Sequence, residues 1–217
     1  MDAQVKAKPE LKVIKEEEIP HLLIPGEVGA ILELIVRDKR GKITEKRVLK
    51  SESFVRQFLE LLWIQTNQIG PTTPYSMRNT ANVLKSVYNY FSSFRCDAGS
   101  GIVTHGIIVG TGTLAPTIND YALQTPIAHG TAASQLQYSA VTFGAPASDA
   151  TTSQFTITRN FANGSGAAIT VNEIALYVRG YDGADQYFMV IRDVISGGIA
   201  VPNGQTLTVN YREQAVA

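Results

Sequence analysis

From Gly99 to the C-terminus, the chain alternates short β-rich runs with turn dipeptides, and this pattern restricts the fold more than any other feature. In one run Leu207, Val209 and Tyr211 alternate with threonine and asparagine. A period of two predicts strands with one buried face and one solvated face. The β-rich runs span residues 102–109, 136–143, 153–161, 168–179, 186–194 and 205–211.

Turn signals separate these runs. The dipeptides Asn163-Gly164, Asp182-Gly183 and Asn203-Gly204 are typical of tight hairpin turns. No helical period intervenes between the runs, and strands at this spacing are typical of a sandwich or a barrel. The sequence therefore predicts a mainly β protein: an antiparallel β-sandwich, jelly-roll-like or Ig-like, with one N-terminal α-helix.

The run 153–161 contains one interruption. Phe155, Ile157 and Phe161 share one face of the expected strand, while Thr156 and Thr158 lie on the other. Arg159 falls on the apolar face by parity, and the alternation continues across it.

The first half of the chain carries an expected β-hairpin and the expected helix. Residues 29–37 and 42–49 are β-rich and flank the polar loop 38–41, which ends in glycine. Residues 52–66 then change to a helical period. The apolar positions that define this period are Phe54, Phe58, Leu61 and Leu62.

Local signals mark both ends of this helix. Either Ser51 or Ser53 would cap its first turn, and Glu52 would lie near the positive end of the helix dipole. Gly70-Pro71 terminates it. Val55, Leu59 and Trp63 widen the apolar stripe beyond half of the circumference, which predicts burial on several sides. Burial within one subunit is the preferred interpretation, and a helix clasped between subunits is the alternative.

The segments around these elements are less regular. Residues 80–95 fit both helical spacing and strand composition, and we interpret them as a strand. Residues 1–26 are expected to form an extended N-terminal arm, either a solvated tail or a segment that orders against a neighbouring subunit. Residues 27–217 are expected to form a single β-sandwich domain that carries helix 52–66.

Composition excludes several classes of protein. The formal net charge is zero, the last lysine is Lys85, and no basic stripe for nucleic-acid binding is visible. No apolar stretch is long enough for a transmembrane helix, and the N-terminus lacks the apolar region of a secretory signal. The single cysteine, Cys96, excludes an intrachain disulfide, and without a nearby base we expect it to be unreactive.

The sequence singles out no phosphate loop, nucleophilic serine, facing carboxylate pair or metal site. Gly110-Thr111-Gly112 follows a strand-like run, but no lysine or helix follows it, so a tight turn is preferred to a phosphate loop. Asn163-Gly-Ser-Gly166 lies between strands, where its serine falls in a turn. The acidic residues of the second half are dispersed and suggest no facing carboxylate pair.

Metal binding has no better support. The three histidines, His21, His105 and His129, have no companions at ligand spacing. Asp182 and Asp185 flank a glycine without forming a calcium loop. We therefore predict no catalytic residues, no cofactor and no metal, and a protein that is not an enzyme.

The chain resembles structural proteins of tailed bacteriophages and related viruses. The resemblance covers most of the chain from about Val28, including the turn 38–41 with residues 53–55 and the helix that follows. It is carried mainly by residues 106–116 (GIIVGTGTLAP), 120–123 (DYAL), 127–130 (IAHG), 135–138 (QLQY), 161–166 (FANGSG), 169–177 (ITVNEIALY), 189–194 (MVIRDV) and 201–209 (VPNGQTLTV).

The resemblance implies a virion component, in the capsid, neck, tail or baseplate, that is synthesised in the host cytoplasm. Its expected partners are further copies in a symmetric homo-oligomer and other virion structural proteins, with no sequence-specific nucleic-acid contact and no membrane. A receptor- or glycan-binding surface module is the alternative, because Tyr181 and Tyr187 flank the 182–183 turn and suit sugar stacking.

Two further expectations concern the last strands. Glu173 interrupts an apolar strand and either pairs with Arg192 on a neighbouring strand or is solvated. The final strand, 205–211, is expected at a sheet edge, where it could pair with another subunit.

Overall fold

The structure is a computed structural model that describes residues 23, 25–51, 54–89 and 94–217. It is mainly β, and the described residues contain one helix, α1 (Arg56–Thr66). The strands are β1 (Val28–Arg37), β2 (Ile43–Ser51), β3 (Tyr75–Arg78), β4 (Leu84–Val87), β5 (Gly106–Gly110), β6 (Gln137–Tyr138), β7 (Thr142–Phe143), β8 (Ala147–Ser148), β9 (Thr152–Ala162), β10 (Ile169–Tyr181), β11 (Asp185–Val201) and β12 (Thr206–Val216).

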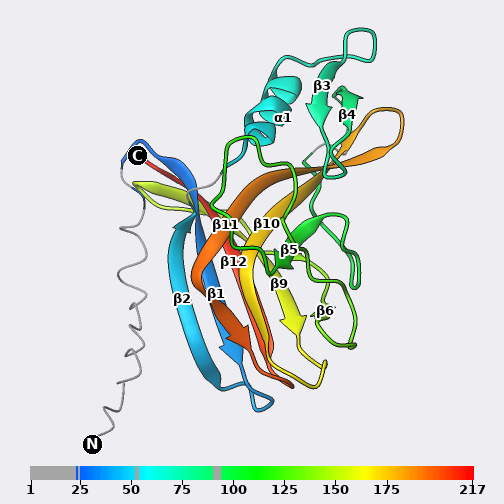
Figure 1. Cartoon of the computed structure of the whole chain (residues 1–217). Coiled ribbons are helices and arrows are strands. Elements are labelled where there is room, and N and C mark those ends of the chain that lie inside the picture. The colour runs from blue at the N-terminus through cyan, green and yellow to red at the C-terminus, as the bar shows by residue number, and fades with distance from the viewer. Residues whose placement is uncertain (1–22, 24, 52–53, 90–93) are drawn as a thin grey trace, which may run out of the picture.

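These strands form three antiparallel sheets (Figure 1). The largest has the order β2-β1-β12-β9-β6, with β7 and β8 also paired to β9. The second has the order β11-β10-β5, and β3 and β4 form a separate hairpin. In Figure 1 this hairpin and α1 lie together at one end of the two larger sheets, and the β1–β2 turn lies at the opposite end.

The two larger sheets share one hydrophobic core. The predicted alternation in β12 is confirmed, because Leu207, Val209 and Tyr211 are fully buried. From β12 the Tyr211 hydroxyl donates to Asp193 Oδ2 on β11 at 2.8 Å, so the inner face of β12 meets the second sheet. The expected hairpin at residues 29–49 is also confirmed, as β1 and β2 pair antiparallel.

Helix α1 begins at Arg56, four residues after the predicted start, and is not capped by a serine. The cap position is Val55, with no side-chain hydrogen bond. Ser51 instead ends β2 and donates its hydroxyl to Asp193 Oδ2 at 2.9 Å. The Val55 amide donates to the carbonyl of Val190 at 3.1 Å, so the chain runs along β11 before it can turn into a helix. Residues 52 and 53 lie outside the described residues.

The predicted burial of α1 on several sides is wrong within this chain. Leu61 and Ile64 are fully buried, but Leu59, Leu62 and Trp63 are 64%, 44% and 46% exposed. The helix packs on β11 and β3 along one side, and no described segment covers the rest of its apolar stripe. A helix with such a wide apolar stripe therefore leaves large side chains at the surface.

Further expectations change in detail. The final strand is not at an edge, since β12 pairs along its length with β1 on one side and β9 on the other. The run 102–109 becomes a strand only from Gly106, and residues 136–143 break into β6 and β7. Within the described part of 80–95, the strand interpretation holds for β4 alone, and residues 90–93 lie outside the described residues. Most of the expected arm (1–22 and 24) also lies outside them.

Candidate functional site

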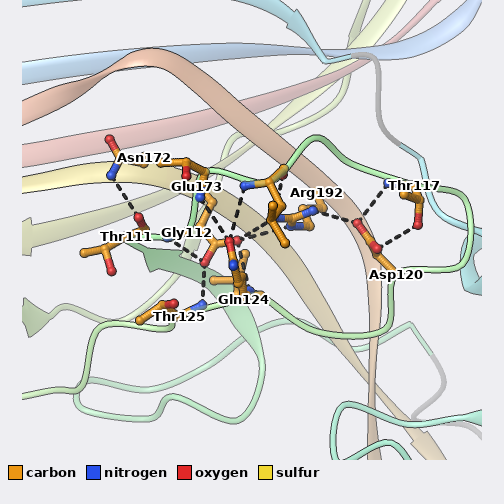
Figure 2. A network of polar contacts seen from close by, with 12 residues as sticks. Thr111, Gly112, Thr117, Asp120, Gln124, Thr125, Asn172, Glu173 and Arg192 are labelled. Carbon is orange, nitrogen blue, oxygen red and sulfur yellow. Dashed lines mark hydrogen bonds and ion pairs between the residues drawn. The ribbon is translucent and has the colours of Figure 1, made fainter.

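The most extensive buried polar network centres on Glu173 of β10, which is fully buried. The segment of residues 111–125, named here the covering loop, runs past this carboxylate (Figure 2). Three backbone amides of the covering loop donate to it: Gly112 at 3.1 Å, Gln124 at 3.0 Å and Thr125 at 2.7 Å. The carboxylate therefore fixes two stretches of the loop to one side chain.

The glycines of Gly110-Thr111-Gly112 make this approach possible. A Cβ at Gly112 would lie 2.5 Å from Glu173 Oε1, and one at Gly110 would lie 2.6 Å from the same atom. Side-chain carbons do not tolerate such distances, so only glycine leaves room for the carboxylate. The motif cradles an anionic group of its own chain, which agrees with the preference for a turn over a phosphate loop.

Arg192 of β11 completes the network, and its predicted pairing with Glu173 is confirmed. Its Nε and Nη2 atoms donate to Glu173 Oε2 at 3.1 and 2.9 Å. Its Nη1 atom donates to Asp120 Oδ2 at 2.7 Å (Figure 2). Its Nη2 atom also donates to the carbonyl of Leu114 at 3.0 Å. Arg192 thus joins β10 and β11 to the middle of the covering loop.

Asp120 is held from two sides. Its carboxylate accepts hydrogen bonds from the Thr117 amide at 2.9 Å and the Thr117 hydroxyl at 2.7 Å, in addition to Arg192. Partial burial works to raise the pKa of Asp120, but these hydrogen bonds and the Arg192 charge outweigh it and lower the pKa overall. The acidic and basic groups of the network are fully engaged with one another, which suits a positioning role for the loop.

The covering loop places Ile118 at the surface beside α1. The Arg56 amide donates to the carbonyl of Ile118 at 3.0 Å, and the Ile118 side chain is 58% exposed. Ile118 lines a shallow hollow together with side chains from α1 and β3. We name this surface the α1 patch, and its residues are Arg56, Leu59, Glu60, Trp63, Tyr75 and Ile118.

The α1 patch is apolar with one charge of each sign. Arg56 Nε and Glu60 Oε1 form an ion pair at 3.2 Å, and the Tyr75 hydroxyl donates to Glu60 at 3.2 Å. Trp63 meets Tyr75 edge-on, with ring centroids 5.2 Å apart. The patch therefore presents broad aromatic and aliphatic area without a net charge.

Arg159 is a buried cation that the sequence interpretation did not identify. It is fully buried, and its guanidinium donates to five backbone carbonyls, those of Gly99, Ile102, His105, Ile107 and Ser139. It also lies 4.8 Å from the centre of the Tyr138 ring. Burial lowers the pKa of Arg159 to about 10, so it remains charged at neutral pH and holds the segment before β5 against β9. The sequence signal that could have identified this buried cation is its position on the apolar face of the strand.

The two described histidines have separate partners. Tyr138 donates its amide to His129 Nδ1 at 3.0 Å, and His105 stacks on Tyr187 with centroids 5.7 Å apart. His21 lies outside the described residues. Within the described ranges, no group of three or more potential ligands could hold a metal ion.

The remaining candidate residues have partners within the chain. Asp182 accepts a hydrogen bond from Gln186, and Asp185 pairs with Arg179 at 2.9 Å. Tyr181 packs edge-on against Tyr88, with centroids 5.6 Å apart, so both tyrosines of the alternative glycan site contact aromatic neighbours. Asn163-Gly-Ser-Gly166 lies between β9 and β10, as expected for a turn.

Cys96 has the environment of an unreactive thiol. It is buried, and burial together with the nearby Asp97 and Glu213 carboxyls raises its pKa to about 12. The thiol is therefore protonated at neutral pH, in agreement with the sequence interpretation.

Comparisons of this chain with protein-family models, curated proteins and solved structures found no match. Among the residues that the structure describes, no helix has the length and hydropathy needed to span a membrane.

Proposed function

We propose that this protein is a non-enzymatic structural subunit of a tailed virus particle, where it assembles into a symmetric homo-oligomer beside other virion proteins. In the particle it would belong to the capsid, neck, tail or baseplate. We further propose that the fold is a β-sandwich, jelly-roll-like or Ig-like. Two antiparallel sheets around one core support this proposal. The resemblance of residues 106–209 to such subunits supports the virion setting.

The α1 patch is the observation that carries the assembly proposal. It gathers Leu59, Trp63 and Ile118 on one surface, each more than 40% exposed. Contiguous apolar surface of this kind on a folded chain marks an interaction site. Large aromatic side chains such as Trp63 are also enriched among the residues that dominate binding energy at interfaces.

A second copy of this chain is the partner that the charges of the patch favour. In a two-fold interface the same surface meets itself, so each charge must face its opposite. Arg56 and Glu60 satisfy this condition, since Arg56 of one copy can pair with Glu60 of the next. The rigid support of Ile118 by the covering loop reduces the entropy lost on association.

Sheet edges are a less favourable route to assembly. The edge strand β2 carries Glu45, Lys46, Arg47 and Lys50, and charged side chains on an edge oppose pairing with another strand. The glycan-binding alternative has less support than assembly, because Tyr181 and Tyr187 are each packed against another ring.

Sedimentation equilibrium of Leu59→Asp tests the use of the α1 patch. We expect the wild-type chain to associate and the variant to be monomeric at the same concentration, since a charge within the patch opposes burial. Ile43→Asp is the matched control, because Ile43 is 44% exposed and begins β2 directly after the β1–β2 turn. That turn lies at the opposite end of the sheets from α1 (Figure 1). A monomeric wild-type protein, or equal effects of both substitutions, would contradict the proposal.

Mass spectrometry of purified virus particles tests the virion assignment separately. The chain is expected in washed particles at a fixed stoichiometry to the other structural proteins. Its absence from particles, with the protein left in the host lysate, would refute this part of the proposal whatever its oligomeric state.

A further inference from the structure

A cavity of about 360 Å³ lies between the two larger sheets, near the side of α1 that faces them. Its walls come from β9 and β12 on one side and from β10 and β11 on the other. Four phenylalanines contribute to the lining: Phe58, Phe94, Phe143 and Phe155. Phe143 and Phe155 are 49% and 38% exposed, which places them at the mouth. The volume is in the range of small-molecule sites.

Glu213 of β12 is the one charged residue among the described residues that line this cavity. It lies directly across from Phe155 in the β9–β12 register. Its carboxylate has no hydrogen bond or ion pair to any residue that the structure describes, and the residue is half-buried. A carboxylate that loses part of its hydration beside aromatic walls, without a partner from its own chain, is a candidate partner for a cationic ligand.

The groups around Glu213 make its environment acidic. Asp193 of β11 faces it from the second sheet and already accepts hydrogen bonds from Ser51 and Tyr211. Cys96 contributes a protonated thiol. Burial, followed by the charge of Asp193, raises the pKa of Glu213 to about 7, and no cationic side chain among the described residues offsets these effects.

We propose that this cavity binds a small apolar molecule that carries one protonated amino group, with Glu213 as the partner of the ammonium. The aromatic walls would hold the apolar body and also favour a nearby cation. A carboxylate ligand would be repelled by Glu213 and Asp193, and a neutral ligand would leave Glu213 without a counter-charge. This inference does not depend on the proposed virion role.

Three ligands of one shape test the proposal: hexylamine, 1-hexanol and hexanoate, titrated into the full-length protein with detection by NMR chemical shifts. At about pH 8.5, where Glu213 is ionised, hexylamine should bind about tenfold more tightly than 1-hexanol, as expected for a charge-assisted hydrogen bond. Hexanoate should bind most weakly. At about pH 5.5 the preference for the amine should shrink, because Glu213 is then protonated.

Glu213→Gln separates the charge from the cavity. The variant should keep affinity for 1-hexanol and lose the roughly tenfold preference for hexylamine. Glu45→Gln, on the outer strand β2, should retain the wild-type preference. Equal binding of amine and alcohol by the wild-type protein, or an unchanged preference in Glu213→Gln, would overturn the proposal. The proposal would also be overturned if Glu213→Gln changed the oligomeric state while the wild-type protein did not bind hexylamine. That result would indicate that a lysine side chain of another copy occupies the cavity.

Discussion

Two glutamates on facing sheets, Glu173 fully buried and Glu213 half-buried, have opposite surroundings. Glu173 of β10, under the covering loop, accepts hydrogen bonds from five donor atoms, three of them backbone amides and two from Arg192. Glu213 of β12, in the cavity between the sheets, has no such donor among the described residues. One carboxylate ties distant segments together, and the other is available to a partner from outside the chain.

The difference shows that burial by itself does not define the role of an acidic group. A buried carboxylate that is surrounded by donors stabilises the structure that supplies them. A buried carboxylate without donors destabilises the ionised protein and gains energy from any cation that reaches it. The following predictions test this contrast through stability.

The largest expected effect is that of Arg192→Met. Loss of the guanidinium leaves Glu173 as an uncompensated buried charge, so the free energy of unfolding should fall by about 4 kcal/mol. Urea unfolding followed by circular dichroism measures it. Lys50→Met, which breaks the more exposed pair with Glu27, should cost less than about 1 kcal/mol. Strictly additive losses in a double-mutant cycle with Glu173→Gln would show that the two groups are not coupled.

The next largest effect is that of Glu213→Gln, and it has the opposite sign. The folded-state pKa of about 7 lies above the ordinary value of 4.5, so wild-type stability should decrease as pH rises from about 4.5 to about 7. The variant should lack this decrease and be more stable at about pH 8, by up to about 3 kcal/mol. Unfolding curves across this pH range measure the difference. If the free energies of unfolding of the two proteins changed with pH in the same way, Glu213 would not be an unpaired carboxylate with a raised pKa.

A third prediction concerns the glycine cradle. Gly112→Ala should cost about 2 kcal/mol, because its Cβ would lie 2.5 Å from Glu173 Oε1 and force the covering loop outwards. Gly144→Ala is the matched control, since its nearest neighbour would be an ordinary contact at 3.7 Å. Thermal unfolding compares the two. Equal melting temperatures would mean that the loop does not depend on the close approach.

The smallest expected effect is that of Asp120→Asn, at the outer end of the network. Loss of the charge-assisted bond to Arg192 should cost about 1 kcal/mol at neutral pH. Because the folded-state pKa of Asp120 is lowered, its contribution is present above the ordinary value of 3.8 and is lost as pH falls through the folded-state pKa. The variant should therefore be less sensitive to acid than the wild type. An unchanged acid limb of the stability curve would contradict this assignment.

Much of the fold was predictable from local patterns. The alternation in β12 and the dipeptide turns at 163–164, 182–183 and 203–204 predicted elements that the structure contains. The start of α1 was not predictable in this way. Ser51 and Val55 are both engaged by β11, and local capping preferences do not include such a tertiary partner.

The candidate sites were less predictable from the sequence than the fold. The Glu173–Arg192 pair was recognisable as a hypothesis, because each charge interrupts an apolar strand. The same signal at Arg159 was visible but not interpreted, although a cation on the buried face must find acceptors. The cavity at Glu213 had no comparable signal, since its walls come from residues between 58 and 213 in the sequence.

The sequence by itself determined the strand-rich second half, its turns and the excess of apolar surface on the helix, because these depend on neighbours within a few residues. Only the tertiary structure decided which buried charges have partners. Gly112 and Glu173 are 61 residues apart, and a donor at that separation reaches its acceptor only when the sheets and the covering loop have assembled.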